Sequence, residues 1–381
     1  MLKSQPYEKL IMLACFLCNI SQIPLFFENR LLALSYMGCW IVLLIFLCFN
    51  NMRTLKFRYF ICPCLFDIFC VVMMLLNNRY VSSDLFRPIN LSTFIFLIGI
   101  LAGEYFEENS LRNISAAFIS SALIVALYLY MNIFRGVDWA NSGAYLYASK
   151  NSAGQIFLTA ATLTILIFLK EHKILSTGII IFFTALIIMM KSRATLVTLA
   201  IIVIYILIFV VERPVYRVLG IILILFLFFM IFTNEGLYNL YINQIMLHNK
   251  DATDITGITS ERDIQYDYFA QNFKYYLLTG TGGTYIESMP LSVLMSYGLI
   301  GGIPVLIYSL YPLYIGIKNS RIWQYKRFCN IIISLALMMW INGVFEEQSP
   351  FGPGVKCYFL WLITGIFLGY KQRNEMYDRN E

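Results

Sequence analysis

Three short groups of charged residues carry the side chains best suited to chemistry. Lys191-Ser-Arg-Ala194 lies between two hydrophobic segments, Thr259-Ser-Glu-Arg262 lies in a long polar stretch, and Glu287 comes just before another hydrophobic segment. An arginine can bind a phosphate group through two parallel hydrogen bonds, which a lysine cannot do. A carboxylate can take a proton from a reacting hydroxyl group. Arg193 and Arg262 could therefore bind an anionic substrate group, and Glu287 is a candidate general base.

Each of these residues also has a purely structural interpretation. Arg193 could extend toward lipid headgroups, Arg262 could be a solvated charge paired with a nearby carboxylate, and Glu287 could cap a helix. The run Gly280-Thr-Gly-Gly283 could bring backbone amides close to a phosphate, or it could simply let the chain turn. The residue types alone leave both interpretations open.

The elements that position these residues are hydrophobic helices. The chain is 59% hydrophobic and 13% charged, whereas about 25% of residues are charged in a typical soluble domain. A helix needs about 20 apolar residues to cross the hydrocarbon core of a membrane. Candidate segments predict an all-α polytopic membrane protein of about 12 transmembrane helices, forming a single integral membrane domain over residues 1–381. The segments are 10–27, 31–50, 59–77, 89–104, 114–133, 152–169, 174–190, 194–211, 218–232, 291–317, 328–345 and 355–370.

The basic residues predict how the chain is oriented. With 12 spans, both termini lie on the same side of the membrane. Most of the 28 Lys and Arg residues lie in the termini and loops on that side. Short loops rich in Lys and Arg face the cytoplasm. Both termini are therefore predicted to be cytoplasmic, and the one large loop, 234–290 between spans nine and ten, to face the opposite side. The net charge of +6 follows from this bias and gives no indication of nucleic-acid binding.

The large loop favours an enzyme over a transporter. It has too many aromatic residues for a disordered tether. Its segments 235–246 and 263–278 have apolar residues at helical spacing, which predicts two amphipathic helices on the membrane surface. Carriers are commonly built from two equivalent halves, but here the large loop divides the predicted spans unequally. We expect the loop to close over a site at the membrane surface.

Neither a metal nor a cofactor is predicted. The acidic residues between 251 and 267 do not have the spacing of a calcium-binding loop. The nine cysteines lie in or beside hydrophobic segments and are expected to pack as small apolar residues. Asp67 lies within a predicted span, where we expect a structural hydrogen bond. The segment 345–353 could line a sugar-binding groove or could be a plain turn.

The order of the motifs resembles the O-antigen polymerase and ligase superfamily. The resemblance covers about residues 149–304. Its elements are Lys150-Asn151 before the sixth span, Ser192-Arg193 at the start of the eighth, Ser260-Glu-Arg262 in the large loop, an aromatic helix, Gly280-Thr-Gly-Gly283, and a Leu-x-x-Leu pattern that ends in Gly298-Leu-Ile-Gly301.

This resemblance implies transfer of a glycan from undecaprenyl pyrophosphate on the periplasmic side of the bacterial inner membrane. The family's two arginines that bind the pyrophosphate correspond to Arg193 and Arg262. Lys150 and Asn151 match its Lys-Asn motif and are expected to bind substrate, as are the glycines of the large loop: Gly280, Gly282 and Gly283.

One position favours the polymerase branch of this superfamily, of the Wzy type. The ligase branch has a His-Asn pair where this chain has Glu287-Ser288. The two histidines lie elsewhere: His172 is predicted to be cytoplasmic, and His248 is a weaker candidate base in the loop. Expected partners are lipid-linked glycans, membrane lipids, a chain-length regulator and a flippase. The alternatives are an O-antigen ligase and a polysaccharide or solute transporter.

Overall fold

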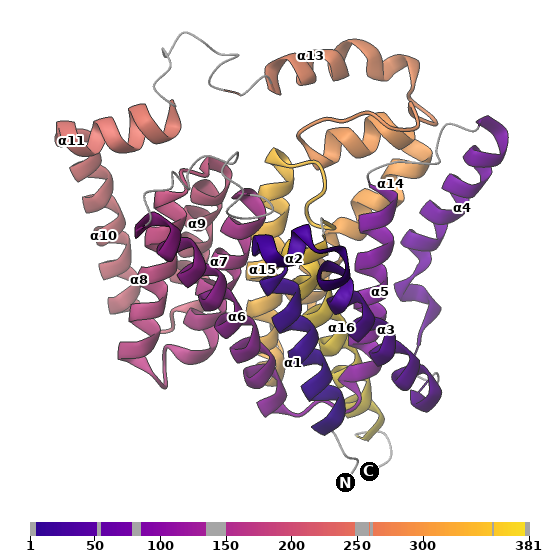
Figure 1. The fold of residues 1–381 in the computed structure, drawn as a ribbon, viewed down its shortest axis with the longest axis horizontal. Coiled ribbons are helices and arrows are strands. Elements are labelled where there is room, and N and C mark those ends of the chain that lie inside the picture. The colour runs from indigo at the N-terminus through magenta and orange to yellow at the C-terminus, as the bar shows by residue number, and fades with distance from the viewer. Residues whose placement is uncertain are drawn as a thin grey trace.

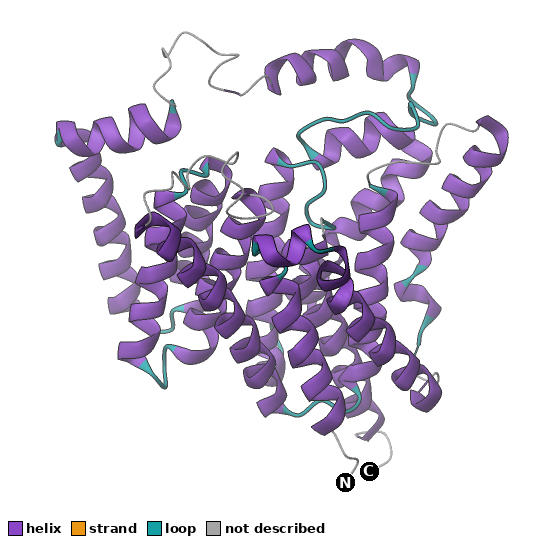
Figure 2. Cartoon of the chain, viewed as in Figure 1, coloured by secondary structure: helices purple, strands orange, loops and turns teal. Residues whose placement is uncertain are grey.

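The chain is built from helices. The computed structural model describes residues 5–51, 55–77, 85–134, 150–247, 259, 262–352 and 354–377. Every regular element within these ranges is a helix (Figure 2). Eight of them are long and apolar enough to cross a membrane, so the chain is a polytopic membrane protein.

The predicted hydrophobic segments correspond well to the observed helices. Each of them overlaps a helix, although a turn at 21–23 breaks the first. The number of crossings beyond the eight long helices stays a prediction. The helices that overlap these segments are α1 (Gln5–Ile20), α3 (Arg30–Asn51), α4 (Ile61–Asn77), α5 (Phe86–Gly103), α6 (Glu108–Phe134), α7 (Lys150–Leu163), α8 (Lys173–Met189), α9 (Arg193–Tyr205), α10 (Pro214–Thr233), α14 (Met289–Asn319), α15 (Lys326–Phe345) and α16 (Gly354–Tyr377), and the short α2 (Pro24–Glu28) follows α1.

Two elements lie across one end of the bundle. Both chain ends lie at the lower end of Figure 1, and α11 (Glu235–Tyr238) and α13 (Arg262–Asn272) run across the opposite end. A π-helical segment, Asn239–Met246, continues α11. The predicted helix over 235–246 is therefore confirmed. The one predicted over 263–278 is shorter, because α13 ends at Asn272 and a 3-10 turn, Phe273–Tyr275, follows it.

The centre of the bundle contains a close contact between α5 and α16. Gly99 and Gly103 on α5 face Gly365 and Gly369 on α16. A Cβ atom added at Gly99 would lie 2.5 Å from the Leu362 carbonyl oxygen. Small residues at four-residue spacing let two membrane helices approach until their backbones touch. This contact fixes α16, and with it the segment that joins α15 to α16.

Helices α7 and α15 run in opposite directions with a regular register. Asn151 near the start of α7 donates a hydrogen bond to Glu346 just after the end of α15. Two turns further into the bundle, Thr159 Oγ1 lies 4.0 Å from Met338 Sδ. The two contacts lie eight residues apart on both helices. The register therefore places the start of α7 beside the end of α15.

Helix α14 is broken at Gly298, and the Gly-rich turn fits into the break. Gly298 has a φ of 62° and a ψ of −162°, which interrupts the helix. The amides of Thr281 and Gly282 donate to the carbonyls of Met295 and Ser296, at 2.9 Å each. The carbonyls of 277 and 278 accept from the amides of 299 and 300. Polar backbone groups that a break exposes in a membrane protein need such partners, and these four hydrogen bonds supply them.

Other expectations concern single side chains. Asp67 on α4 accepts a hydrogen bond from the amide of Asn90 on α5 at 3.0 Å, as expected for a structural role. All nine cysteines are free thiols, and each is buried or partly buried. Among the described residues, no group of three or more His, Cys, Asp or Glu side chains could hold a metal ion.

Candidate functional site

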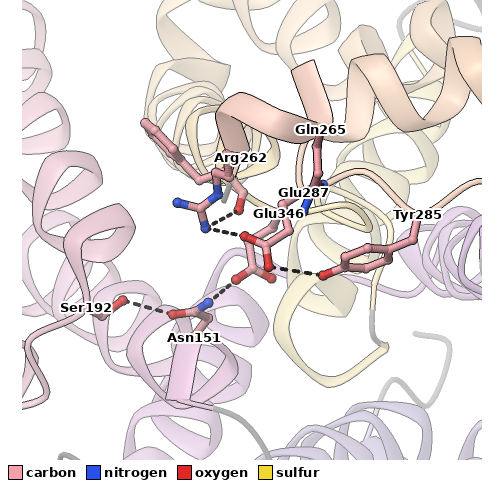
Figure 3. Close-up of polar contacts among 8 residues, drawn as sticks. Asn151, Ser192, Arg262, Gln265, Tyr285, Glu287 and Glu346 are labelled. Carbon is pink, nitrogen blue, oxygen red and sulfur yellow. Dashed lines mark hydrogen bonds and ion pairs between the residues drawn. The ribbon is translucent and has the colours of Figure 1, made fainter. Parts of the chain in front are cut away.

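The candidate site lies beneath α13, where three parts of the chain meet. Arg262 begins α13, Glu287 comes two residues before α14, and the segment after α15 passes between them and α7 (Figure 3). The turn from Gly280 to Gly283 is tied to the broken helix, and this connection holds residues 284–288 against α14. The site is therefore built on the ends of helices rather than on a free loop.

Arg262 and Glu287 form an ion pair at the centre of the site. Arg262 Nη2 lies 2.7 Å from Glu287 Oε2, with the two side chains 21% and 30% exposed. The same nitrogen donates to the Phe345 carbonyl oxygen at 3.2 Å, and the guanidinium lies 6.0 Å from the Phe345 ring centroid. The Glu287 amide donates to Gln265 Oε1 at 2.6 Å, which ties α13 to the start of α14.

The side chain of Glu287 is therefore not a helix cap. Ser288 is the residue that precedes the first turn of α14, and no side chain caps that turn. The Glu287 carboxylate instead contacts Arg262 and accepts a hydrogen bond from the Tyr285 hydroxyl at 3.3 Å. Both interpretations of Glu287 were open from the sequence, and the structure favours the one in which its carboxylate faces the site.

Arg193 supplies a second positive charge. It is the first residue of α9, and it lies close enough to Arg262 for their positive charges to interact. The turn that leads into α9 contains Lys191 with a φ of 50°, a left-handed conformation that is uncommon for a residue other than glycine. Two guanidinium groups from separate helices thus share one region, an arrangement that suits a ligand with more than one negative charge.

A chain of hydrogen bonds forms the floor of the site. The Ser192 hydroxyl donates to Asn151 Oδ1 at 3.1 Å, and the Asn151 amide nitrogen donates to Glu346 Oε1. Ser192 also shares a hydrogen bond of 2.9 Å with Thr195 Oγ1. The contact to Ser192 leaves the amide nitrogen of Asn151 facing Glu346 (Figure 3). Ser192, at the start of α9, thereby helps orient the carboxylate of Glu346, which follows α15.

Glu347, the neighbour of Glu346, has a different setting. Its side chain is 8% exposed, and Ser292 on α14 donates to its Oε1 at 2.8 Å. Glu347 therefore ties the segment after α15 to α14. Partial burial and the negative charges of Glu287, Glu347 and Glu346 raise the pKa of Tyr285 to about 12, so its hydroxyl stays protonated at physiological pH.

The structure brings together four of the residues singled out from the sequence: Arg193, Arg262, Glu287 and Asn151. Lys150 is the first residue of α7, next to Asn151, and its side chain lies outside the described part. His248 also lies outside the described residues. Substrate binding by Lys150 and a role in substrate binding or as a weaker candidate base for His248 stay predictions.

The three loop glycines all have positive φ angles, and Gly280 is also required by close packing. A Cβ atom on Gly280, whose φ is 73°, would lie 2.4 Å from the backbone of Ser296. The Gly282 amide donates to α14, as described above, whereas Gly283 is exposed. In this arrangement the amides of 281 and 282 contact the protein rather than a ligand, so any contribution of the glycines to phosphate binding stays a prediction.

Sequence reasoning did not identify Glu346, Glu347, Tyr285 or Gln265 as site residues. The segment 345–353 was recognised only as a possible wall of a groove. The one signal available was its position: two adjacent carboxylates at the end of a predicted span, on the same side as the large loop. Their contacts with Asn151 and Ser292 depend on tertiary packing, which a single sequence does not reveal.

Comparison with known proteins adds no assignment. A scan against protein-family models finds no match, and a search of curated proteins finds none either.

Proposed function

We propose that this chain is a glycosyltransferase that polymerises lipid-linked oligosaccharide repeat units into an O-antigen or related surface polysaccharide. The growing glycan on undecaprenyl pyrophosphate is the donor, and a single lipid-linked repeat unit is the acceptor. The observation that carries the proposal is that Arg262 and the start of α9, which contains Arg193, meet at one region with carboxylates. Arg262 contacts Glu287 and the Phe345 carbonyl oxygen, and Ser192 is linked through Asn151 to Glu346. The order of motifs from Lys150 to Gly301 supports the same reaction.

The two arginines suit the leaving group of this reaction. A pyrophosphate carries several negative charges, and it gains charge as the bond to the sugar breaks. Arginine side chains that are already in place stabilise such developing charge. Arg262 already pairs with the Glu287 carboxylate, so a pyrophosphate that binds Arg262 would compete with that carboxylate.

In the proposed reaction, a hydroxyl oxygen of the acceptor sugar attacks the anomeric carbon of the donor. A new carbon–oxygen bond forms as the bond from the anomeric carbon to the pyrophosphate oxygen breaks, and the electron pair stays with the pyrophosphate. The hydroxyl proton passes to a carboxylate of the site, for which Glu287 is the candidate taken from the sequence. Tyr285 is unsuited to this task because its raised pKa of about 12 keeps it protonated.

The proposal includes an orientation in the membrane. About 12 spans, both termini in the cytoplasm and a periplasmic loop over 234–290 would place the site at the outer surface of the inner membrane. Helix α13 supports this placement, because it has no buried residue and it exposes Ile264, Tyr266 and Tyr268. Aromatic residues of this kind favour the lipid headgroup region. Lipid-linked substrates would then reach the arginines from the bilayer.

Gel analysis of surface polysaccharide tests the proposal against its alternatives. A deletion strain should produce lipopolysaccharide that carries one repeat unit without the ladder of longer chains. Loss of a ligase would instead leave the lipid core bare, and loss of a flippase would trap repeat units on the cytoplasmic side. The native chain should restore the ladder, and Arg262→Ala should not. A ladder that persists in the deletion strain would rule out the polymerase assignment.

A further inference from the structure

Two buried amide side chains have no hydrogen-bond partner at either polar atom. Gln155 on α7 is 1% exposed, and Asn342 on α15 is 0% exposed. Within the described part of the chain, neither the amide nitrogen nor the amide oxygen of either side chain makes a hydrogen bond. Nearly all buried polar groups in folded proteins have a partner, because a buried group without one is costly. These four atoms therefore need an explanation.

Other buried amides of the bundle do have partners within the protein. The side-chain nitrogen of Asn19 donates to the Phe118 carbonyl oxygen at 3.1 Å. The side-chain nitrogen of Asn132 donates to the carbonyl oxygen four residues earlier in its own helix, at 2.8 Å. The amides on α7 and α15 make neither kind of contact among the described residues. Their polar atoms are thus available to a bound molecule.

The register of the two helices places these amides opposite each other. The two contacts described above join α7 to α15 at points eight residues apart on each helix. Gln155 lies midway between the two contacts on α7, and Asn342 lies midway between them on α15. Residues four apart along a helix share a face, so both amides lie between the helices. Their level is about one helical turn deeper in the bundle than that of Asn151 and Glu346.

We propose that Gln155 and Asn342 hold internal water between α7 and α15, one turn beneath the floor of the candidate site. An amide nitrogen donates hydrogen bonds and an amide oxygen accepts them, and water can do both. A buried water molecule typically makes about three hydrogen bonds to polar groups that have no other partner. Each helix supplies one donor atom and one acceptor atom, which meets this requirement. The proposal holds whatever reaction the site performs.

Three other arrangements fit these atoms less well. A cation such as calcium or magnesium takes oxygen ligands, so it would leave both amide nitrogens without a partner. A sugar hydroxyl would need an opening to the surface, but both side chains are at most 1% exposed. A direct bond between the amides would satisfy one nitrogen and one oxygen, whereas none of the four atoms has a partner in the described part of the chain. Water is small enough and has both donors and acceptors.

Hydroxyl-radical labelling tests directly for the water. X-ray irradiation of the purified full chain in nanodiscs generates radicals from water, including internal water, and mass spectrometry measures the oxidation of each methionine. Met338 is 0% exposed and lies one turn from Asn342 on the same face of α15. It should be oxidised several-fold faster in the native chain than in the double variant Gln155→Leu/Asn342→Leu. The control Asn132→Leu, which removes a buried amide that has a partner, should leave Met338 oxidation at the native rate.

Thermal unfolding tests whether the two amides share one site. Gln155→Leu and Asn342→Leu should each lower the transition temperature, because each leaves the opposite amide and the water with fewer partners. The double variant replaces both polar groups by apolar ones, so it should be no less stable than the weaker single variant. Additive losses in the double variant would show two separate sites and would contradict the proposal.

The two experiments together separate water from a direct amide contact. A direct contact would also give non-additive losses, but Met338 would then be oxidised equally slowly in the native chain and the double variant. That result would overturn the water site, and so would oxidation that is equally fast in both, because water would then reach Met338 by another route. If the double variant does not fold, Gln155→Leu alone should slow the oxidation of Met338, and an unchanged rate in that variant would count against the proposal.

Discussion

Arg262 Nη2 and Glu287 Oε2 lie 2.7 Å apart, and this ion pair joins the first residue of α13 to the segment that leads into α14. The contact links two residues that the sequence identified separately, one as an anion-binding arginine and the other as a carboxylate base. It also means that neither acts alone, because an anion that binds Arg262 at Nη2 competes with Glu287 for that group.

Replacing Arg262 should abolish chain extension. Arg262→Ala removes one of two charges that stabilise the departing pyrophosphate, and loss of one such donor typically costs about 10²–10³-fold in kcat. Arg262→Lys should restore only a small part, because lysine cannot bind a phosphate through two parallel hydrogen bonds. The rate of extension of a lipid-linked repeat unit measures this. Arg213→Ala is the control, since Arg213 lies over the ring of Tyr216 just before α10, away from the arginine pair. Full activity of Arg262→Ala would contradict the prediction.

The break in α14 should depend on two glycines. Gly298→Ala places a side chain at a φ of 62° and within 2.4 Å of the Leu278 backbone, and Gly280→Ala meets the Ser296 backbone at the same distance. The backbone conformation of Gly298, with a φ of 62° and a ψ of −162°, costs about 1–3 kcal/mol for a residue other than glycine, and the contacts add to it. Both variants should lower the thermal transition and the yield of folded protein.

Gly178→Ala on α8 is the matched control for these substitutions, because an added Cβ there meets nothing within 4 Å. If Gly298→Ala unfolds at the same temperature as Gly178→Ala, the turn and the helix break do not pack as tightly as described here.

The contact between α5 and α16 should not tolerate a large side chain. Gly365→Leu would push against the Phe96 carbonyl oxygen, which lies close to the added Cβ, and the two helices would have to separate. We expect a marked loss of folded protein in detergent. Gly38→Leu on α3 should have little effect, since the space around Gly38 is open. Equal yields of the two variants, measured by size-exclusion chromatography, would argue against this packing.

Tyr285 should not contribute an ionisation to the pH profile of the reaction. Its ordinary pKa is about 10, and partial burial and the surrounding carboxylates raise it to about 12. The hydroxyl therefore remains protonated as the pH rises from 6 to 10, and its hydrogen bond to Glu287 is lost only near pH 12. Tyr285→Phe should lower the rate modestly and leave the shape of the profile unchanged over that range. An alkaline limb that disappears in Tyr285→Phe would contradict this.

Much of the architecture could be predicted from the sequence, because hydrophobic segments of membrane length must form helices. The 3.6-residue pattern also revealed the helix that begins at Arg262. Its end was placed too late, at 278, because α13 ends at Asn272 and the chain beyond it must reach the broken helix α14, to which Leu277 and Leu278 are hydrogen-bonded. That demand comes from tertiary structure and overrides the local pattern.

The candidate site was predictable only in part, because some of its residues are brought together by tertiary structure. Arg193 and Glu287 stood out because they lie next to predicted spans on the side opposite the basic loops, and Arg262 stood out because arginine suits phosphate binding. Glu346 did not, because its importance arises from Asn151, which is far away in the sequence. The paired glycines of α5 and α16 did have a readable signal, a four-residue spacing in both helices, which sequence reasoning overlooked.

The most direct test of the central claim is chain extension by the purified protein in nanodiscs, supplied with a lipid-linked repeat unit on undecaprenyl pyrophosphate. Product length would be followed on a gel for the native chain, Arg193→Ala, Arg262→Ala and the control Arg213→Ala. The account predicts a ladder of lipid-linked chains with the native protein and with Arg213→Ala, release of undecaprenyl pyrophosphate in step with each added unit, and no ladder with either arginine variant of the site. A ladder of native length from Arg193→Ala and Arg262→Ala, or no extension by the native protein, would contradict it.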